Sequence, residues 1–135
     1  MSTKPDKDLF KAHLSYWKNK LSLGHQFIEV AYDYAGVGAE CSMNHESLIA
    51  TISIGEVDEV WTEAILARHE MLELLLEPIR NITWKDVNED RLYRASHEVI
   101  HRLENILPIP SDEDIGYIRN KKEIKCHSKK GHPKK

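Results

Sequence analysis

The spacing of apolar residues along the chain predicts a helix followed by a strand. Between about Leu9 and Leu21 the apolar side chains recur at helical intervals, with lysines between them. From His25 the period changes to two, so that Ile28 and Val30 share one side of an extended segment. This alternation is typical of a strand that turns one apolar face toward a core.

Two more strands are predicted directly after the first. Gly36 and Gly38 interrupt the chain, and the segment 39–43 can return as a second strand. After a turn at 44–46, the segment 47–54 is rich in β-branched residues. Because the connections are short, we expect an antiparallel meander of three strands.

Two helices follow the predicted sheet. The first is expected to begin with Asp58 as its N-cap and to end at Glu77, before Pro78. The second is expected from about Asp90 to Leu107, and two prolines follow it. The sequence therefore predicts an α+β fold, with a small antiparallel sheet packed against an N-terminal helix and two C-terminal helices.

The first of these two helices carries polar residues inside the apolar run 66–76. His69, Glu70 and Glu73 follow the order of a His-Glu-x-x-His motif in which Glu73 replaces the second histidine. On a helical wheel His69 and Glu73 share a face flanked by apolar residues, whereas Glu70 falls on a polar flank with Glu59, Glu63 and Glu77. A charged glutamate in apolar surroundings needs a partner or a cation. Two explanations stand: a buried His69–Glu73 pair, or a divalent metal that needs at least one more ligand.

The last helix contains a literal His-Glu-x-x-His motif, His97 to His101. Its apolar stripe is expected to face the core and consists of Leu92, Ala95, Val99, Leu103 and Ile106. On the same wheel His101 lies almost opposite that stripe, on a face that is expected to be exposed to solvent. His97 lies at the edge of the stripe. His101 and Glu98 are therefore kept as alternative metal ligands.

Length and charge indicate one domain with two extensions. The 135 residues are enough for a single core, which we assign to 9–110, with a disordered N-terminus at 1–8. The net charge is −3, but eight of the 19 basic residues and one of the 22 acidic residues lie after Tyr117. We expect the segment 111–135 to be a basic, disordered tail attached to an acidic body.

The cysteine count and the hydropathy pattern indicate where in the cell the protein is expected. Cys41 and Cys126 lie far apart and are too few for a disulfide framework. No apolar run approaches the roughly 20 residues that span a bilayer, and no signal peptide is recognised at the start. We expect a soluble, cytoplasmic protein with no membrane contact.

Several segments together resemble small zinc metallopeptidases of minimal zincin type, as found among phage and prophage proteins. The resemblance covers about Phe10 to Leu107 and rests on Tyr16-Trp17, Leu21-Ser22-Leu23-Gly24, Ala39-Glu40-Cys41, Ala50–Ile54, Arg68–Leu76 and His101-Arg102-Leu103-Glu104. It implies a sheet whose edge strand precedes the metal helix and a third ligand from the helix that follows.

The resemblance also implies a ligand set and a reaction. Glu73 replaces the family's second histidine, while His97 stands where the family has an acidic ligand. We therefore expect an exchange, in which His69, Glu73 and His97 bind zinc. Glu70 would then be the general base of a hydrolase that attacks peptide bonds.

The alternative is a zincin-like interaction module without catalytic activity. In that case His69 and Glu73 form a buried polar pair, and the basic tail is the functional part. The tail would attract nucleic acid or another acidic partner through contacts that weaken with salt.

Overall fold

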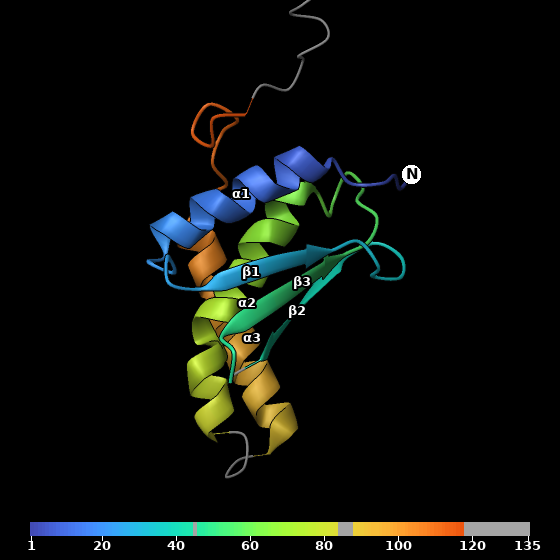
Figure 1. The fold of residues 1–135 in the computed structure, drawn as a ribbon. Helices are drawn as coiled ribbons and strands as arrows, with labels where there is room; N and C mark the ends of the chain where they lie inside the picture. Colours follow the sequence, from blue (N-terminus) through green and yellow to red (C-terminus); the bar gives the residue numbers. More distant parts are fainter. Residues whose placement is uncertain (45, 84–87, 118–135) are drawn as a thin grey trace, which may run out of the picture.

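The computed structural model describes residues 1–44, 46–83 and 88–117. Three helices and three strands follow one another along the chain (Figure 1): α1 (Lys7–Lys20), β1 (Phe27–Ala31), β2 (Ala39–Asn44), β3 (Ile49–Ile54), α2 (Glu63–Thr83) and α3 (Glu89–Ile106). The predicted α+β class, with an N-terminal helix and two C-terminal helices around a three-stranded sheet, is confirmed. None of the described helices is long and apolar enough to cross a lipid bilayer.

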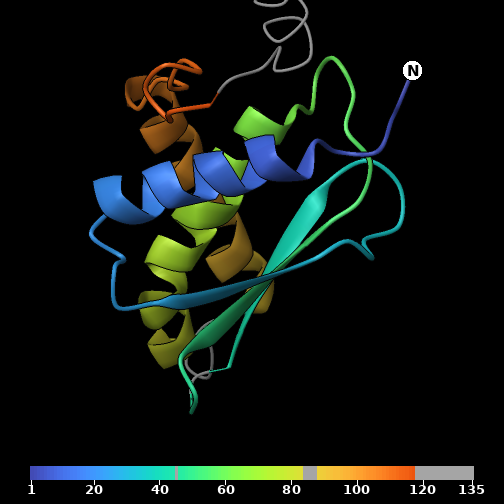
Figure 2. The ribbon, with the colours of Figure 1, turned by 45° about the horizontal axis from the view of Figure 1, so that its top comes forward.

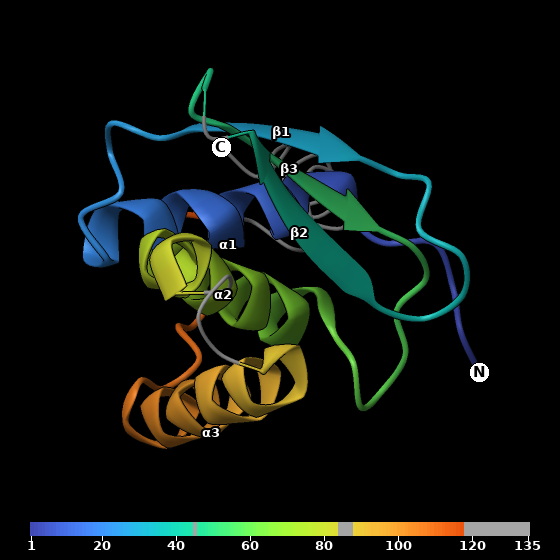
Figure 3. The same cartoon turned by 90° about the horizontal axis from the view of Figure 1, so that it is seen from below.

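The helices lie on one side of the sheet, and α2 is the central one. Figure 3 shows α1 and α2 beneath the strands and α3 on the outer side of α2. Helix α2 contacts α1, α3 and β2, so it is covered on three sides. This position explains why its sequence is apolar around most of its circumference.

The sheet is mixed, which corrects the antiparallel meander expected from the sequence. Strand β3 lies in the middle, pairing antiparallel with β2 and parallel with β1. The segment between β1 and β2 is not a hairpin, because it passes the end of β3 and enters the sheet at its other edge (Figure 2). Backbone hydrogen bonds hold this crossing: Glu56 N donates to Gly36 O over 2.7 Å, and Gly55 N donates to Gly38 O over 2.9 Å.

The crossing depends on a glycine at position 55. A Cβ atom there would lie 2.2 Å from Gly36 O and 2.4 Å from Tyr34 O, which are backbone atoms that cannot move aside freely. Gly36 itself has a φ of +82°, a conformation that favours glycine. Gly55 and Gly36 thus permit a close approach of two backbone segments.

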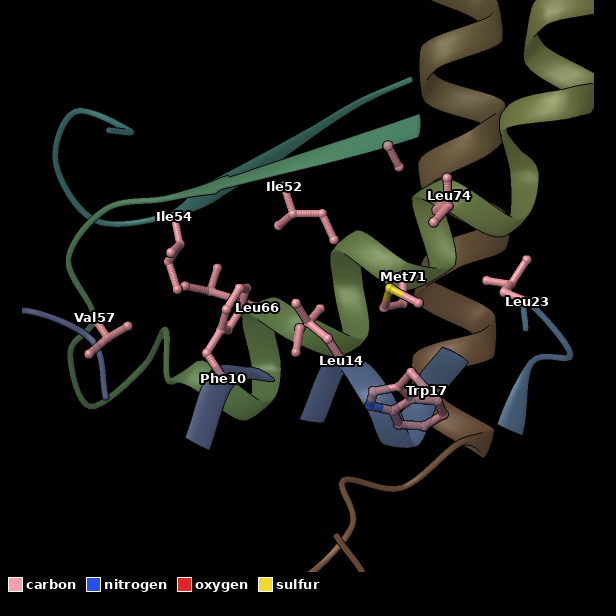
Figure 4. Packing of buried hydrophobic residues seen from close by; sticks show 12 residues of the cluster. Phe10, Leu14, Trp17, Leu23, Ile52, Ile54, Val57, Leu66, Met71 and Leu74 are labelled. Carbon is pink, nitrogen blue, oxygen red and sulfur yellow. The ribbon is translucent and has the colours of Figure 1, made fainter. Parts of the chain in front are cut away.

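The core forms between the sheet and α1 and α2 (Figure 4). Every second residue of β3 is fully buried, and the strand pairing places Val30 and Cys41 beside Ile52 on the same face. The helices supply the other side of the core with Phe10, Leu14, Trp17, Leu66, Ala67, Met71 and Leu74. The alternation predicted for the first strand is confirmed, since Ile28 and Val30 of β1 pack against the core while Phe27 and Glu29 are exposed.

Both ends of the described chain contact the domain. Helix α1 begins at Lys7, inside the segment for which we expected disorder, and Thr3 forms a bridge with Val57. At the other end the Tyr117 hydroxyl donates to the Asp6 carboxylate, which itself belongs to the N-cap residue of α1. The basic tail after Tyr117 lies outside the described residues.

Helix α2 has different ends from those predicted. Asp58 is not its N-cap, because its carboxylate accepts from Val60 N and Trp61 N in the preceding turn, while Thr62 Oγ1 accepts from Ile65 N. A proline inside a helix removes one backbone hydrogen bond. Helix α2 nevertheless continues past Pro78 to Thr83.

Helix α3 faces α2 with a different side from the one expected. Ser96 and Ile100 are buried, whereas Val99 and Ile106, members of the predicted stripe, are 43% and 70% exposed. His97 and Glu104 lie partly buried beside Ile100. The helix therefore turns toward α2 a face that combines one large apolar residue with polar groups.

We predict that Ile100→Ala lowers the free energy of unfolding by about 2–5 kcal/mol, because it leaves a cavity in a fully buried site. Val99→Ala is the matched control on the same helix and should cost about 1 kcal/mol or less. Urea denaturation of both variants measures the difference. An equal loss in the two variants would show that α3 packs in the orientation first expected from the sequence.

Candidate metal centre

Three potential ligands come together where α2 faces α3. His69 and Glu73 lie one turn apart on α2, and His97 projects from α3 toward them. His69 Nε2 is 3.1 Å from Glu73 Oε2, and His97 Nε2 is 3.9 Å from the same oxygen. The candidate ligand atoms of the three residues all lie within 4.8 Å of one another, so the group could hold a metal ion.

The donor set fits a divalent transition metal. Zinc takes imidazole nitrogen and carboxylate oxygen at about 2.0–2.2 Å, so tetrahedral ligands stand roughly 3.4 Å apart. The two separations from Glu73 Oε2, 3.1 Å and 3.9 Å, bracket that value. Two neutral imidazoles and one carboxylate leave a position for a further ligand, which is the composition of catalytic rather than structural zinc sites.

The other nitrogen of each imidazole already has a partner. His69 Nδ1 lies 3.0 Å from Glu104 Oε2, and His97 Nδ1 lies 3.0 Å from the backbone oxygen of Tyr93. The Tyr93 ring also stacks on His97, with 4.0 Å between the ring centroids. Both histidines are thus held with Nε2 toward Glu73.

Glu73 is surrounded by positive or potentially positive groups. Arg80 Nη1 lies 3.2 Å from Glu73 Oε1, whereas both histidines face Glu73 Oε2. Burial acts to raise the pKa of Glu73, but the hydrogen bond from His69 and the charges of His97 and Arg80 outweigh it and lower that pKa. The pKa of His69 is raised to about 9, chiefly by its hydrogen bond to Glu73. Burial acts to lower this pKa, and the hydrogen bond to Glu104 acts to raise it.

Glu70 is buried, which corrects the solvated flank expected for it. Its side chain is 2% exposed, and within the described part of the chain its Oε1 atom has no hydrogen-bond partner. Burial, together with the nearby charge of Glu73, raises the pKa of Glu70 to about 8. A carboxyl group with such a pKa can exchange a proton near neutral pH.

A cleft of about 570 Å³ connects these groups with the sheet. Its walls include His69, Glu70, Glu73 and His97 on one side and residues 37–41, which lead into and form the start of β2, on the other. Cys41 also lines the cleft. Burial, and to a smaller extent the charge of Glu70, raise the pKa of its thiol to about 12. The thiol is therefore protonated in the metal-free protein, and Cys41 does not belong to the convergent group.

The alternative ligands lie outside this group. The side chains of His101 and Glu98 are 75% and 65% exposed, and Glu98 pairs with Arg102 instead. The literal His-Glu-x-x-His motif of α3 therefore contributes one residue, His97, to the centre. Sequence reasoning missed Glu104 and Arg80, although Glu104 stands seven residues after His97 and thus on the same helical face.

Comparisons of the chain with models of protein families, with curated proteins and with solved structures find no match. What the centre can do therefore follows from its own donor atoms, charges and cleft.

We predict that the metal-free protein loses stability as the pH rises. The folded-state pKa of Glu70 is about 8 against an ordinary 4.5, so the stabilisation is complete below about pH 4.5 and is lost as the pH rises through 8. His69 acts in the same direction, with stabilisation complete below 6.5 and lost as the pH rises through about 9. Urea denaturation at several pH values, with a chelator present, measures this slope.

The contribution of Glu70 can be isolated with Glu70→Gln, which cannot lose a proton. This variant should show a shallower fall in stability between about pH 5 and 8 than the wild type. Glu98→Gln, at an exposed position of α3, is the control and should keep the wild-type slope. If Glu70→Gln also keeps that slope, Glu70 does not hold its proton in the folded protein.

Proposed function

We propose that this protein is a zinc-dependent hydrolase of peptide bonds, similar to a minimal zincin. The observation that carries the proposal is the convergence of His69, Glu73 and His97 in an open cleft, beside the buried carboxyl group of Glu70. Zinc bound there would supply Lewis-acid chemistry, acidifying water and polarising a carbonyl group. The two imidazoles and the carboxylate are ligand types that zinc accepts in one coordination set.

Glu70 is the proposed general base. It follows His69 directly in the sequence, lines the same cleft and has an Oε1 atom that no described group hydrogen-bonds. A base works best when its pKa lies near the operating pH. Burial raises the pKa of Glu70 to about 8 in the metal-free protein, and the charge of a bound zinc ion would lower it toward neutral pH. We assign to Glu70 Oε1 the transfer of a proton from water to the leaving amine.

The edge of the sheet supports a peptide as the substrate. Strand β2 is hydrogen-bonded to β3 on one side, and no described strand pairs with its other side. The start of β2 also forms a wall of the cleft, where Ala39 and Glu40 are among the lining residues. An extended peptide can add to such an edge through main-chain hydrogen bonds, which would lay its carbonyl groups along the cleft.

A catalytically inactive interaction module is the second candidate, and a specific observation favours it. Glu73 already pairs with His69 over 3.1 Å and with Arg80 over 3.2 Å, so its charge is compensated by protein groups alone. This candidate predicts that a chelator leaves the melting temperature of the purified protein unchanged. A large fall in melting temperature on chelation would rule it out.

In that second case the basic tail is the proposed contact for nucleic acid or an acidic partner. Residues 118–135 lie outside the described part of the chain, so this proposal rests on the charge of the sequence. Cytoplasmic location likewise stays a prediction from the sequence.

We predict that untagged protein binds one zinc ion and that His69→Ala abolishes this binding. His69 provides one of three convergent ligands, and losing it leaves too few to hold the ion. His101→Ala is the control, because His101 belongs to the literal motif but is 75% exposed and lies outside the convergent group, with its Nδ1 3.5 Å from Glu104 Oε1. It should keep one zinc ion per protein molecule. Zinc titration followed by calorimetry gives the stoichiometry, and wild-type zinc binding by His69→Ala would contradict the proposed ligand set.

The substitution Glu70→Gln distinguishes the proposed hydrolysis from zinc binding. This variant should bind zinc as tightly as the wild type, because Glu70 is not a ligand, and should lose at least about 100-fold in peptide hydrolysis. Hydrolysis of a casein-derived peptide mixture, read by mass spectrometry, compares the two proteins. Equal hydrolysis by wild type and variant would remove Glu70 from the mechanism.

A further inference from the structure

We propose that Glu104 is a positioning residue that prepares His69 for the metal. Its carboxylate accepts the hydrogen at His69 Nδ1, and this fixes Nε2 as the atom that faces Glu73 and His97. The proposal rests on the metal site proposed above and adds to it a residue that does not touch the ion.

The contact has the geometry of a directed hydrogen bond. Glu104 Oε2 lies 3.0 Å from His69 Nδ1, and the two side chains are 13% and 20% exposed. Glu104 belongs to α3 and His69 to α2, so the bond joins two helices through residues that are 35 positions apart in the sequence. Glu104 Oε2 lies on the Nδ1 side of the ring, away from Nε2, and Glu104 is not part of the convergent group.

Arg68 holds Glu104 in place through its backbone. Arg68 Nη1 donates to Glu104 O, in the last turn of α3, over 3.1 Å and to Leu107 O, at the C-cap, over 2.8 Å. The residue directly before His69 thus binds the end of α3, and His69 itself receives the side chain from that end. This gives Arg68 a structural role, since the unpaired carbonyls of a helix C-terminus need donors.

Without Glu104, His69 has an alternative that would block metal binding. A neutral imidazole carries its hydrogen on one nitrogen only, and metal binding needs the other nitrogen free. Glu73 Oε2 lies 3.1 Å from Nε2 and can accept a hydrogen there as readily as Glu104 accepts one from Nδ1. When a metal ion replaces the hydrogen at Nε2, the one hydrogen left on the ring must be at Nδ1, where Glu104 Oε2 accepts it. A carboxylate on the far side of the ring also makes the imidazole a stronger ligand.

The test compares zinc affinity in four forms of the full chain: wild type, Glu104→Gln, Glu104→Ala and the control Glu98→Ala. Glu104→Ala should weaken zinc binding by about 10–100-fold. Glu104→Gln should lie between Glu104→Ala and the wild type, because its amide oxygen still accepts a hydrogen bond. Glu98→Ala removes an exposed carboxylate from the same helix and should bind zinc like the wild type.

A purely structural role for Glu104 is tested by nitrogen-15 NMR of the histidine rings in the zinc-loaded protein. Wild type should show a slowly exchanging hydrogen on Nδ1 of His69, and Glu104→Ala should lose it while His97 keeps the one bonded to the Tyr93 backbone. Unfolding of each metal-free variant in urea separates folding from affinity. Retention of the His69 signal in Glu104→Ala would overturn the proposal.

The outcomes separate this inference from the proposed function. If the wild type binds no zinc, the proposed function fails and the inference fails with it. If the wild type and Glu104→Ala bind zinc equally, the inference alone is wrong.

Discussion

The burial of α2 between α1, α3 and the sheet sets the conditions for the rest of the molecule. Its apolar residues Leu66, Ala67, Met71 and Leu74 pack into the main core. The polar residues His69, Glu70 and Glu73 are then held in the layer between α2, α3 and β2. Charged groups in such a layer lower stability unless they are paired, protonated or bound to a cation.

Each of these polar residues meets that constraint in a different way. Burial keeps Glu70 protonated over a wide pH range, with a pKa of about 8. Glu73 pairs with Arg80 and His69, while His69 lies between the carboxylates of Glu73 and Glu104. An imidazole with carboxylates at both nitrogens is stable as a cation, and a metal ion at Nε2 can replace that second proton. The same geometry therefore serves the metal-free pair and the proposed metal site.

Sequence periodicity predicted the helices, the strands and the shared face of His69 and Glu73, because these follow from local burial patterns. Periodicity did not predict the features that depend on contacts between segments far apart in the sequence. The parallel pairing of β1 depends on the passage of the chain beside Gly55, which no periodicity encodes. The predicted orientation of α3 was wrong because the prediction turned a stripe of apolar residues toward the core. The face of α3 that is buried or partly buried instead includes the polar residues Ser96, His97 and Glu104. Such conflicts between pattern and burial are expected at functional sites.

X-ray absorption spectroscopy at the zinc edge, on protein titrated with zinc, identifies most directly the atoms that would bind the proposed metal ion. Three residues converge at the centre, and Cys41 lines the same cleft without belonging to that group. We predict nitrogen and oxygen ligands only, with the scattering of two imidazole rings. A sulfur ligand, or the scattering of fewer than two imidazole rings, would contradict the proposed ligand set.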